Sequence, residues 1–402
     1  MDDIQDLAPK GEKQAFEGPH RHQWIPAMQR EYDAHMKNGT WTVVCETEYE
    51  EAVKKGKQVY MIPYVWKYRI KTENGVITRF KARLCANGMF MKCDPKDTFA
   101  PTARASSIKV MCALAASFDC VLHAGDIPAA YIKADIDPKM EIYMPQPRGF
   151  EIEGKENHIV RLNKALYGIP PAGKLWNKEL HKYLQAIGMQ QSKAEPCLYY
   201  IWKDNDVMVI SLSTDDFLHF YTSEELKDRI IKKLKEKFDY EDKGPCTWFL
   251  GMGMVQTEDV IEIDQEDYVR EIVEAYPHVI PRHTPAHERS TLEAKGEDED
   301  DAECDYRSIT GKLRYVTITR PDIEFALNRC CRFQSNPGKT HEEALMWIIG
   351  YLKKHPRVPL RYEKNKAKVN PRDHLFKFTG LGDASLGNGQ KRRSLYGYVI
   401  LG

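Results

Sequence analysis

Apolar residues recur along this chain with two different periods, and each period predicts a different kind of element. A recurrence every three to four positions, typical of helices, marks four segments: Pro26–Met36, 106–118, 173–187 and 224–238. Pro26 is expected in the first turn of its helix, where a missing N–H costs nothing. A fifth helix is expected to begin at the capping-box sequence Thr340-His341-Glu342-Glu343 and to end before Pro356.

Shorter apolar or alternating runs predict strands. They are Val59–Ile62, Tyr64–Ile70, Val76–Phe80, Cys120–His123, Val207–Ser213 and Phe217–Tyr221. Glu73-Asn74-Gly75 separates the second and third runs, and its Asn-Gly step favours a tight hairpin turn. Because strands and helices are interspersed, we expect an α+β or mixed α/β fold followed by a mainly helical C-terminal part.

The composition is that of a folded protein without membrane segments. Of 402 residues, 42% are apolar and 29% charged, enough for two or three domains with their own cores. No apolar run approaches the ~18 residues of a membrane helix, and the acidic N-terminus differs from a signal peptide, so we expect an intracellular protein. Residues 1–22 are polar and are predicted to be disordered. The ten cysteines form no C-x-x-C pair, which argues against a structural zinc site.

The net charge of zero hides a segregation of charge along the chain. Residues 293–305 contain eight acidic residues and one lysine, which predicts an acidic linker, whereas residues 60–110 contain ten Lys and Arg against three acidic residues. The overall balance therefore says little about partners, and the basic segment is compatible with an anionic one.

Three aspartates are candidates for metal chemistry. Asp215 and Asp216 lie in a turn between two apolar strands, and Asp126 follows another predicted strand. By themselves Asp215 and Asp216 also fit an ordinary solvated turn. With a third carboxylate they form a donor set suited to Mg²⁺, and two such ions promote in-line phosphoryl transfer.

Basic residues on the predicted hairpin provide the complementary charge. Lys67, Lys81 and Arg83 lie on strand-like stretches, and alternation places Lys81 and Arg83 on one face. Such a face suits a triphosphate or a nucleic-acid backbone, although a merely solvated face has the same pattern.

Nine short stretches extend this pattern over most of the chain. They are Val65–Lys71, Phe80–Leu84, Asp97–Pro101, Gly125–Tyr131, Leu162–Gly168, Ser213–Asp216, Phe249–Gly251, Tyr306–Gly311 and Thr319–Ile323. In type and order the series resembles the reverse transcriptase of copia-type LTR retrotransposons, part of a Pol polyprotein. The resemblance begins near Trp24 and implies an α+β right-hand polymerase fold with fingers, palm and thumb.

The resemblance also implies the chemistry. Asp126, Asp215 and Asp216 would be catalytic and would bind two Mg²⁺ ions, with Mn²⁺ as a substitute. The primer 3′-hydroxyl would then attack the α-phosphate of a dNTP and release pyrophosphate. The expected partners are an RNA or DNA template with its primer, and dNTPs, without a membrane. The resemblance leaves the oligomeric state open and implies a cytoplasmic location that includes virus-like particles.

Binding roles follow from the same motifs. Lys67, Lys81 and Arg83 would hold the triphosphate, while Tyr131 would lie under the sugar and exclude a 2′-hydroxyl. Tyr167 and Gly168 would line the nucleotide pocket. Phe249, Leu250 and Gly251 would form the hairpin that grips the primer.

The implied domain limits cover the whole chain. After the disordered residues 1–22, fingers and palm would occupy 23–255, with fingers at 58–118 and 160–200 and palm at 119–159 and 201–255. A helical thumb or connection region would occupy 256–365, including the acidic linker 293–305. Residues 370–402 would be the truncated start of an RNase H-like domain with Asp383 as its first catalytic aspartate. Because its other carboxylates should lie beyond residue 402, no RNase H activity is expected from this chain.

Two departures from the family pattern leave open whether this chain is catalytically active. Ser213 replaces the aromatic residue of the Y-x-D-D box, and Ile169–Gly173 contains two prolines and lacks the usual Gln. The first hypothesis is therefore an active RNA-directed DNA polymerase, and the second is a degenerate, non-catalytic relative that only binds nucleic acid. A third, a phosphotransferase that does not act on nucleic acid, lacks a glycine-rich phosphate loop.

Overall fold

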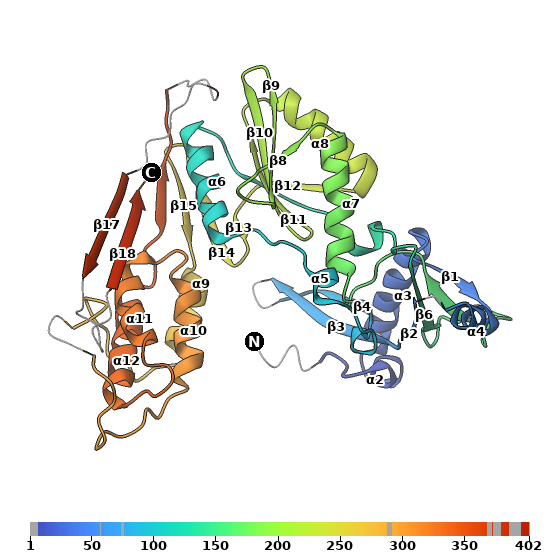
Figure 1. Ribbon diagram of the computed structural model, residues 1–402, viewed down its shortest axis with the longest axis horizontal. Coiled ribbons are helices and arrows are strands. Elements are labelled where there is room, and N and C mark those ends of the chain that lie inside the picture. Colours follow the sequence, from blue (N-terminus) through green and yellow to red (C-terminus); the bar gives the residue numbers. More distant parts are fainter. Residues whose placement is uncertain are drawn as a thin grey trace.

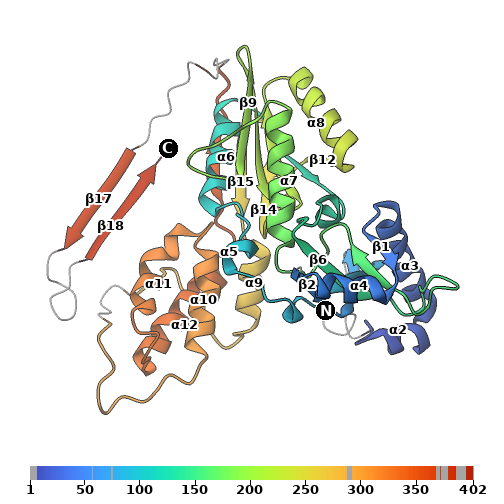
Figure 2. The same ribbon diagram turned by 45° about the vertical axis from the view of Figure 1, so that its right-hand side comes forward.

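The structure is a computed structural model that describes residues 7–56, 58–73, 76–287, 292–367, 372, 379–385 and 395–401. These residues form an α+β fold, as predicted. Figure 1 shows an N-terminal region on one side, a central sheet, and a helical region on the other side. The view in Figure 2 keeps this order, with the helices of the third region on the far side of the central sheet from α2–α4.

The N-terminal region combines three helices, a mixed sheet and a long hairpin. The helices are α2 (Glu12–Glu17), α3 (Arg21–Lys37) and α4 (Glu46–Lys54). The sheet has the order β1 (Trp41–Val44), β7 (Ile159–Leu162), β6 (Met140–Pro145) and β2 (Gln58–Met61), with β2 parallel to β6. The hairpin consists of β3 (Tyr64–Glu73) and β4 (Val76–Ala86), and α3 packs against β4.

The predictions for the beginning of the chain need two corrections. Residues 1–22 were expected to be disordered, but α2 lies within them and its Ala15 is fully buried; residues 1–6 lie outside the described part. Helix α3 begins at Arg21, so Pro26 lies inside the helix and not in its first turn. The earlier start buries Trp24 edge-on against Tyr68 and Phe80, and this aromatic packing offsets the cost of an internal proline.

Three short helices connect the two regions. The 3-10 helix η1 (Gly88–Phe90) follows β4 directly, and α5 (Pro95–Thr98) and α6 (Ala105–Ser117) come next. The last of these is the helix predicted at 106–118.

The central sheet has six antiparallel strands. Their order is β12 (Glu241–Pro245), β5 (His123–Asp126), β11 (Asp216–Tyr221), β10 (Asp206–Ser213), β9 (Leu198–Lys203) and β8 (Gln190–Gln191). Helices α7 (Ala172–Ala186) and α8 (Glu224–Phe238) pack on one face, and α6 packs on the other. The strand predicted at 120–123 begins at His123, which places Asp126 within the sheet and not after it.

The C-terminal half contains a second sheet and the helical region. The sheet has the order β13 (Trp248–Phe249), β14 (Met252–Gln256), β15 (Val260–Asp264) and β16 (Leu360–Glu363). The helices are α9 (Glu266–Glu274), α10 (Tyr306–Val316), α11 (Glu324–Cys331), with the 3-10 turn η3 (Pro321–Ile323) before it, and α12 (Lys339–Lys354). Strands β17 (Thr379–Ser385) and β18 (Leu395–Leu401) form an antiparallel pair.

Three predicted domain limits do not coincide with these units. The limit at 255/256 falls inside β14, which pairs with β15, and residues 140–159 lie with the N-terminal sheet and not with the palm. Strand β8, predicted within the fingers, belongs to the central sheet, and the predicted limit at 200/201 falls inside β9 of the same sheet. Long-range strand pairing decides each of these assignments, and local sequence patterns do not report it.

The acidic run 293–305 packs against the start of α12. Glu299 accepts hydrogen bonds from the Thr340 N–H at 2.9 Å and the Thr340 hydroxyl at 2.7 Å, and the Lys339 N–H donates to the Asp300 carbonyl at 3.0 Å. Negative charge is stabilising at a helix N-terminus, so the run caps α12. The predicted capping box at 340–343 is wrong, because the helix starts at Lys339. The His341 ring instead accepts a hydrogen bond from the Gly338 N–H at 2.8 Å.

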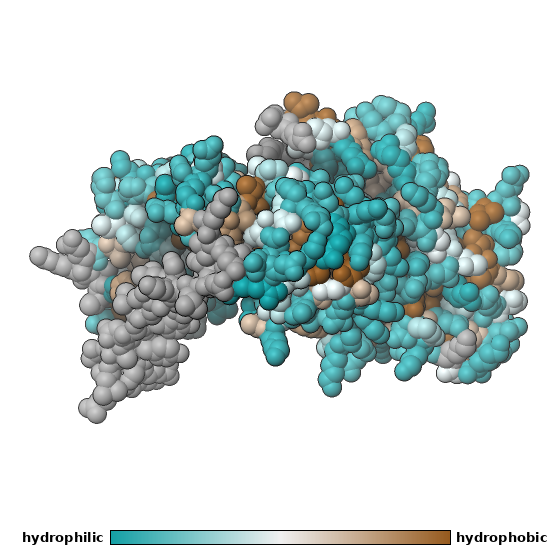
Figure 3. Space-filling model, turned by 90° about the horizontal axis from the view of Figure 1, so that it is seen from above, coloured by the Kyte–Doolittle hydropathy of each residue, from teal (hydrophilic) through white to brown (hydrophobic). Residues whose placement is uncertain are grey.

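The described helices and the surface seen in Figure 3 are mostly polar in character. Among the described helices, none has the length and apolar character needed to cross a bilayer. The face shown in Figure 3 is mostly hydrophilic, with apolar residues in small separate groups.

Candidate active site

The turn between β10 and β11 carries two of the three candidate carboxylates. Ser213 pairs with Asp216 across the hairpin, so Thr214 and Asp215 form a two-residue turn; Ser213–Asp216 is called the carboxylate turn below. Thr214 has a φ of +59°, a left-handed conformation that is unusual for a β-branched residue. The local sequence therefore places Asp215 at the tip and Asp216 at the first position of β11.

The third carboxylate comes from the neighbouring strand. Strand β5 pairs with β11, and Asp126 lies directly opposite Asp216. The Ile127 N–H donates to the Asp215 carbonyl at 3.0 Å, which ties the turn to the end of β5. The structure thus brings together the three aspartates that the sequence separates by about 90 residues.

The charges of these carboxylates act on one another. Burial raises the pKa of Asp215, and the negative charge of Asp126 adds to the increase. Burial also raises the pKa of Asp216, with further contributions from Asp215 and Asp126. The three groups are therefore close enough to repel, and a positive charge among them would relieve that repulsion.

The β3–β4 hairpin presents a cationic face. Alternation buries Trp66, Ile70, Ala82 and Leu84 and leaves the basic side chains on the other face. These are Lys67, Arg69, Lys71, Arg79, Lys81 and Arg83. Burial and the neighbouring Arg83 lower the pKa of Lys81. The positive charges of Arg83 and Lys81 in turn act on the Asp215 carboxylate and lower its pKa, so these two cations face the carboxylates.

Lys67 lies beside Arg83 on the cationic face. It pairs with Arg83 across the hairpin, and its side chain is exposed. The structure therefore groups Lys81 and Arg83 with the carboxylates and leaves Lys67 beside them.

Two tyrosines lie between the cations and the carboxylates. The Arg83 guanidinium stacks over the Tyr167 ring at 4.1 Å, and the Tyr131 and Tyr167 ring centroids are 4.5 Å apart. Burial raises the pKa of both tyrosines, and the charge of Asp215 contributes in each case. Because an arginine stacked on an aromatic ring is held in orientation, this group has the form of a prepared anion pocket.

Gly168 fixes the contact between this pocket and the hairpin. It has a φ of +97°, and a Cβ there would lie 2.0 Å from the Ala86 carbonyl oxygen. A Cβ on Gly88 would lie 2.1 Å from the Gly168 carbonyl oxygen, and the Ala86 N–H donates to the Tyr167 carbonyl at 2.7 Å. Both positions therefore require glycine.

The unusual segment Ile169–Gly173 is accommodated without disruption. Pro171 is the N-cap of α7, where a missing N–H is tolerated, and its carbonyl accepts the Leu175 N–H at 2.9 Å.

The predicted primer-grip residues form a second tight turn. Phe249 pairs with Met252, and Leu250 and Gly251 have φ values of +47° and +78°. The Tyr315 hydroxyl of α10 donates to the Leu250 carbonyl at 3.1 Å. This hairpin turn therefore connects the second sheet to the helical region.

Lys243 and Trp176 lie at the site although no sequence motif indicates them. Lys243 Nζ lies 3.7 Å from Asp126 Oδ2, because β12 pairs with β5 on the side away from β11. The Trp176 indole N–H donates to the Thr214 carbonyl at 2.7 Å. A helical period places Trp176 on the buried face of its helix, but no sequence pattern indicates what it contacts, and none marks Lys243.

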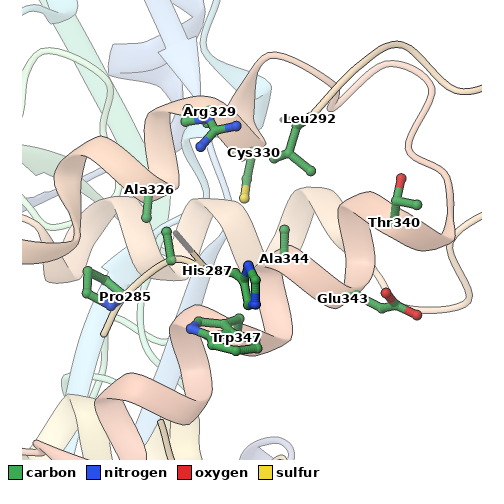
Figure 4. A pocket seen from close by; sticks show the side chains of 11 residues that line it. Pro285, His287, Leu292, Ala326, Arg329, Cys330, Thr340, Glu343, Ala344 and Trp347 are labelled. Carbon is green, nitrogen blue, oxygen red and sulfur yellow. The ribbon is translucent and has the colours of Figure 1, made fainter. Parts of the chain in front are cut away.

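Asp383 and one cavity lie apart from this group. Asp383 is in the middle of β17, opposite Gly397, and its side chain lies outside the described part. A cavity of about 330 Å³ lies between α11, α12, residues 285–287 and Leu292, and Figure 4 shows Trp347, His287 and Arg329 around it. It belongs to the helical region and contains none of the predicted site residues.

The donor chemistry of the three aspartates fits a divalent cation. Within the described residues, no group of three or more His, Cys, Asp or Glu side chains already has the spacing of an assembled metal site. The carboxylates nevertheless supply the hard oxygen ligands that Mg²⁺ prefers, and their mutual repulsion would be relieved by it. An α+β fold with three carboxylates at two strand ends beside a cationic hairpin is the arrangement expected of the template-directed polymerase class.

Comparison with known proteins agrees with this class. The family model described as reverse transcriptase (RNA-dependent DNA polymerase) matches residues 47–283, more than half of the chain. The chain therefore belongs to the reverse transcriptase family.

Similarity to two plant proteins shows which group within the family this chain resembles. The chain is 32% identical over 365 residues to the retrovirus-related Pol polyprotein from transposon TNT 1-94 of Nicotiana tabacum, covering 87% of this chain and 26% of that protein. It is 27% identical over 334 residues to the Pol polyprotein from transposon RE1 of Arabidopsis thaliana, covering 82% and 22%. The predicted kinship with copia-type LTR retrotransposons is confirmed. The chain spans about a quarter of the length of these relatives.

Among solved structures, one match is a foamy viral protease–reverse transcriptase in complex with double-stranded DNA. It is 13% identical, with a TM-score of 0.42, and the match covers 82% of this chain and 48% of that chain.

Proposed function

We propose that this chain is an RNA-directed DNA polymerase that adds dNTPs to a primer 3′-hydroxyl at Asp126, Asp215 and Asp216. The observation that carries the proposal is the register of β5 and β11, which sets Asp126 opposite Asp216 beside a turn that holds Asp215. The Arg83–Tyr167–Tyr131 group supports it, because it presents a cation and two rings to the same carboxylates.

Each group has a distinct role in this proposal. Arg83, oriented by Tyr167, and Lys81 neutralise the triphosphate, while Lys67 extends the cationic face. Tyr131 packs under the sugar, and Gly168 lets the backbone approach closely. The three carboxylates hold Mg²⁺, which supplies charge neutralisation to the attacking and leaving oxygens when bound. Phe249, Leu250 and Gly251 position the primer.

The proposal is tested by Mg²⁺-dependent incorporation of dNTPs on a poly(rA)/oligo(dT) template-primer. The double variant Asp215→Asn, Asp216→Asn should abolish incorporation, because it removes two of the three carboxylates. Asp204→Asn is the matched control: Asp204, like Asp215, lies in a two-residue hairpin turn, at the other end of β10. It should leave incorporation unchanged.

The alternative of a degenerate relative makes the opposite prediction. Such a chain would retain salt-sensitive binding to template-primer but show no incorporation. In that case the variants Ser213→Tyr and Pro171→Gln, which restore the family residues, should increase incorporation strongly. The RNase H-like assignment of residues 370–402 stays a prediction.

A further inference from the structure

The carboxylate turn adopts a conformation that its own sequence disfavours. Of its two central residues, Thr214 has a positive φ and Asp215 does not, as in a type II′ turn, whose first position favours glycine. A threonine held there is strained and persists only when surrounding contacts impose the conformation. The turn must therefore be held by groups outside it.

Two hydrogen bonds from different elements hold the turn. The Trp176 indole N–H donates to the Thr214 carbonyl at 2.7 Å, and the Ile127 N–H donates to the Asp215 carbonyl at 3.0 Å. These are the two successive carbonyls of the turn, so their directions fix the peptide units on either side of Asp215. The Ile127 contact comes from the strand of Asp126, whereas the Trp176 contact comes from α7.

Trp176 is well placed to act as a rigid support. Its side chain is only 1% exposed, and its ring packs edge-on against Phe238 at 5.3 Å. Helix α7 starts at Ala172, four residues after Gly168 of the nucleotide pocket. One helix therefore connects the residues around the pocket to the turn that carries the carboxylates.

We propose that Trp176 is a positioning residue that holds the carboxylate turn in its strained conformation and so aims Asp215 and Asp216. This inference rests on the proposed polymerase function. A cavity of about 40 Å³ beside Tyr131, Trp176 and Thr214 gives the turn room to move when the indole hydrogen bond is lost. Without that bond, the Thr214 peptide turns away and the carboxylates lose their alignment.

The first test compares two tryptophan-to-phenylalanine variants. Trp176→Phe removes the N–H and keeps an aromatic ring. Trp24→Phe is the matched control, because Trp24 is also 1% exposed and packs edge-on against aromatic rings, but its N–H has no partner among the described residues. Trp176→Phe should lower kcat about tenfold and change the KM for dNTP less than about twofold, consistent with loss of one buried hydrogen bond.

A rescue separates positioning from general packing. Thr214→Gly in the Trp176→Phe background should restore most of kcat, because glycine adopts the left-handed conformation without support. A lost packing contact would not be repaired by removing a side chain at position 214. Equal losses in Trp176→Phe and Trp24→Phe, or no rescue by glycine, would overturn the proposal.

A stability measurement tests the inference even if the chain proves inactive. Urea unfolding midpoints of wild type, Trp176→Phe, Thr214→Gly and the double variant form a cycle. Thr214→Gly should raise the urea midpoint more in the wild type than in Trp176→Phe. The reason is that the backbone strain at position 214 is imposed only when the indole N–H is present. Additive shifts would refute the inference, whereas absent incorporation by wild type would refute only the proposed function.

Discussion

Two hairpin turns in this molecule have the same kind of backbone strain and the same kind of supporting hydrogen bond, but in different surroundings. In the carboxylate turn Thr214 has a φ of +59°, and in the turn between β13 and β14 Leu250 has a φ of +47°. In each case the carbonyl of that residue accepts a hydrogen bond from an aromatic side chain on a helix, Trp176 or Tyr315. Trp176 is 1% exposed, whereas Tyr315 is 37% exposed.

The difference in burial makes the two hydrogen bonds unequal. The Trp176 indole donates from a buried position where bulk water competes little, whereas the partly exposed Tyr315 hydroxyl can exchange its bond to Leu250 for one to water. Trp176 and the strand β10 also share one hydrophobic core, whereas Tyr315 reaches across from the helical region. The first turn is therefore held firmly, and the second is a connection that can adjust.

The largest expected effect is that of low pH, which should destabilise the β10–β11 hairpin more than the β13–β14 hairpin. His219, three residues after Asp216 on β11, is fully buried and stacks with His123; neither of its ring nitrogens has a partner among the described residues. Burial lowers the pKa of His219 to about 4, the charges of His123 and Lys227 add to this, and Asp242 opposes it.

In the unfolded chain the pKa of His219 is about 6.5. Above pH ~6.5 the imidazole is therefore neutral in both states, and the stability of the folded state is fully retained. As the pH falls towards 4, the folded state loses up to ~3 kcal/mol. Amide hydrogen exchange should show β10 and β11 opening before β13 and β14 in this range. His219→Phe fills the same space and should remove most of the pH dependence; an unchanged dependence would show that other groups cause it.

A second variant affects only the turn at Leu250. Gly251→Ala should reduce the free energy of unfolding by about 2 kcal/mol, because alanine is strained at a φ of +78° and its Cβ would lie 2.1 Å from the Tyr315 hydroxyl. Gly253→Ala on β14 is the control, since its Cβ would be 3.4 Å from its nearest neighbour, an ordinary contact. Equal losses in urea unfolding would contradict both the backbone strain at Gly251 and the contact with Tyr315.

The hydrogen bonds themselves can be compared directly by urea unfolding. Trp176→Phe should reduce the free energy of unfolding by about 2 kcal/mol, and Tyr315→Phe by less than about 1 kcal/mol, because only the Trp176 donor is shielded from water. If the two losses are equal, burial does not distinguish these turns.

The smallest expected effect is a gain in stability. Leu250 and Gly251 both have positive φ, as in a type I′ turn, for which Asn-Gly is the preferred sequence. Leu250→Asn should therefore raise the free energy of unfolding by about 0.5 kcal/mol relative to wild type. A decrease would show that the Leu250 side chain is needed where it lies.

Local patterns predicted the parts of the site that depend on neighbouring residues. The β3–β4 pairing, helix α8 at 224–238 and the shared face of Lys81 and Arg83 all follow from periodicity and turn chemistry, whereas the predicted Asn74-Gly75 turn lies outside the described residues. The three carboxylates were grouped by chemistry and by family motifs, and the strand register shows how they meet.

The remaining features depend on which distant segments pair. Lys243 reaches Asp126 because β12 lies beside β5, and Trp176 reaches Thr214 because α7 packs behind the turn. The acidic run was expected to be a linker, since its charge is visible in the sequence but its helix N-terminus is 40 residues away. Strand order and packing partners are non-local, so periodicity does not report them.

The facing glycines Gly88 and Gly168 give a criterion for the decay of related gene copies. Each leaves no room for a Cβ against the backbone opposite it, so any other residue at either position forces the hairpin and the pocket loop apart. A copy that keeps all three aspartates but has replaced one of these glycines should therefore be counted as inactivated. Surveys that score only the acidic triad would therefore overestimate how many copies keep the hairpin and the pocket loop in contact.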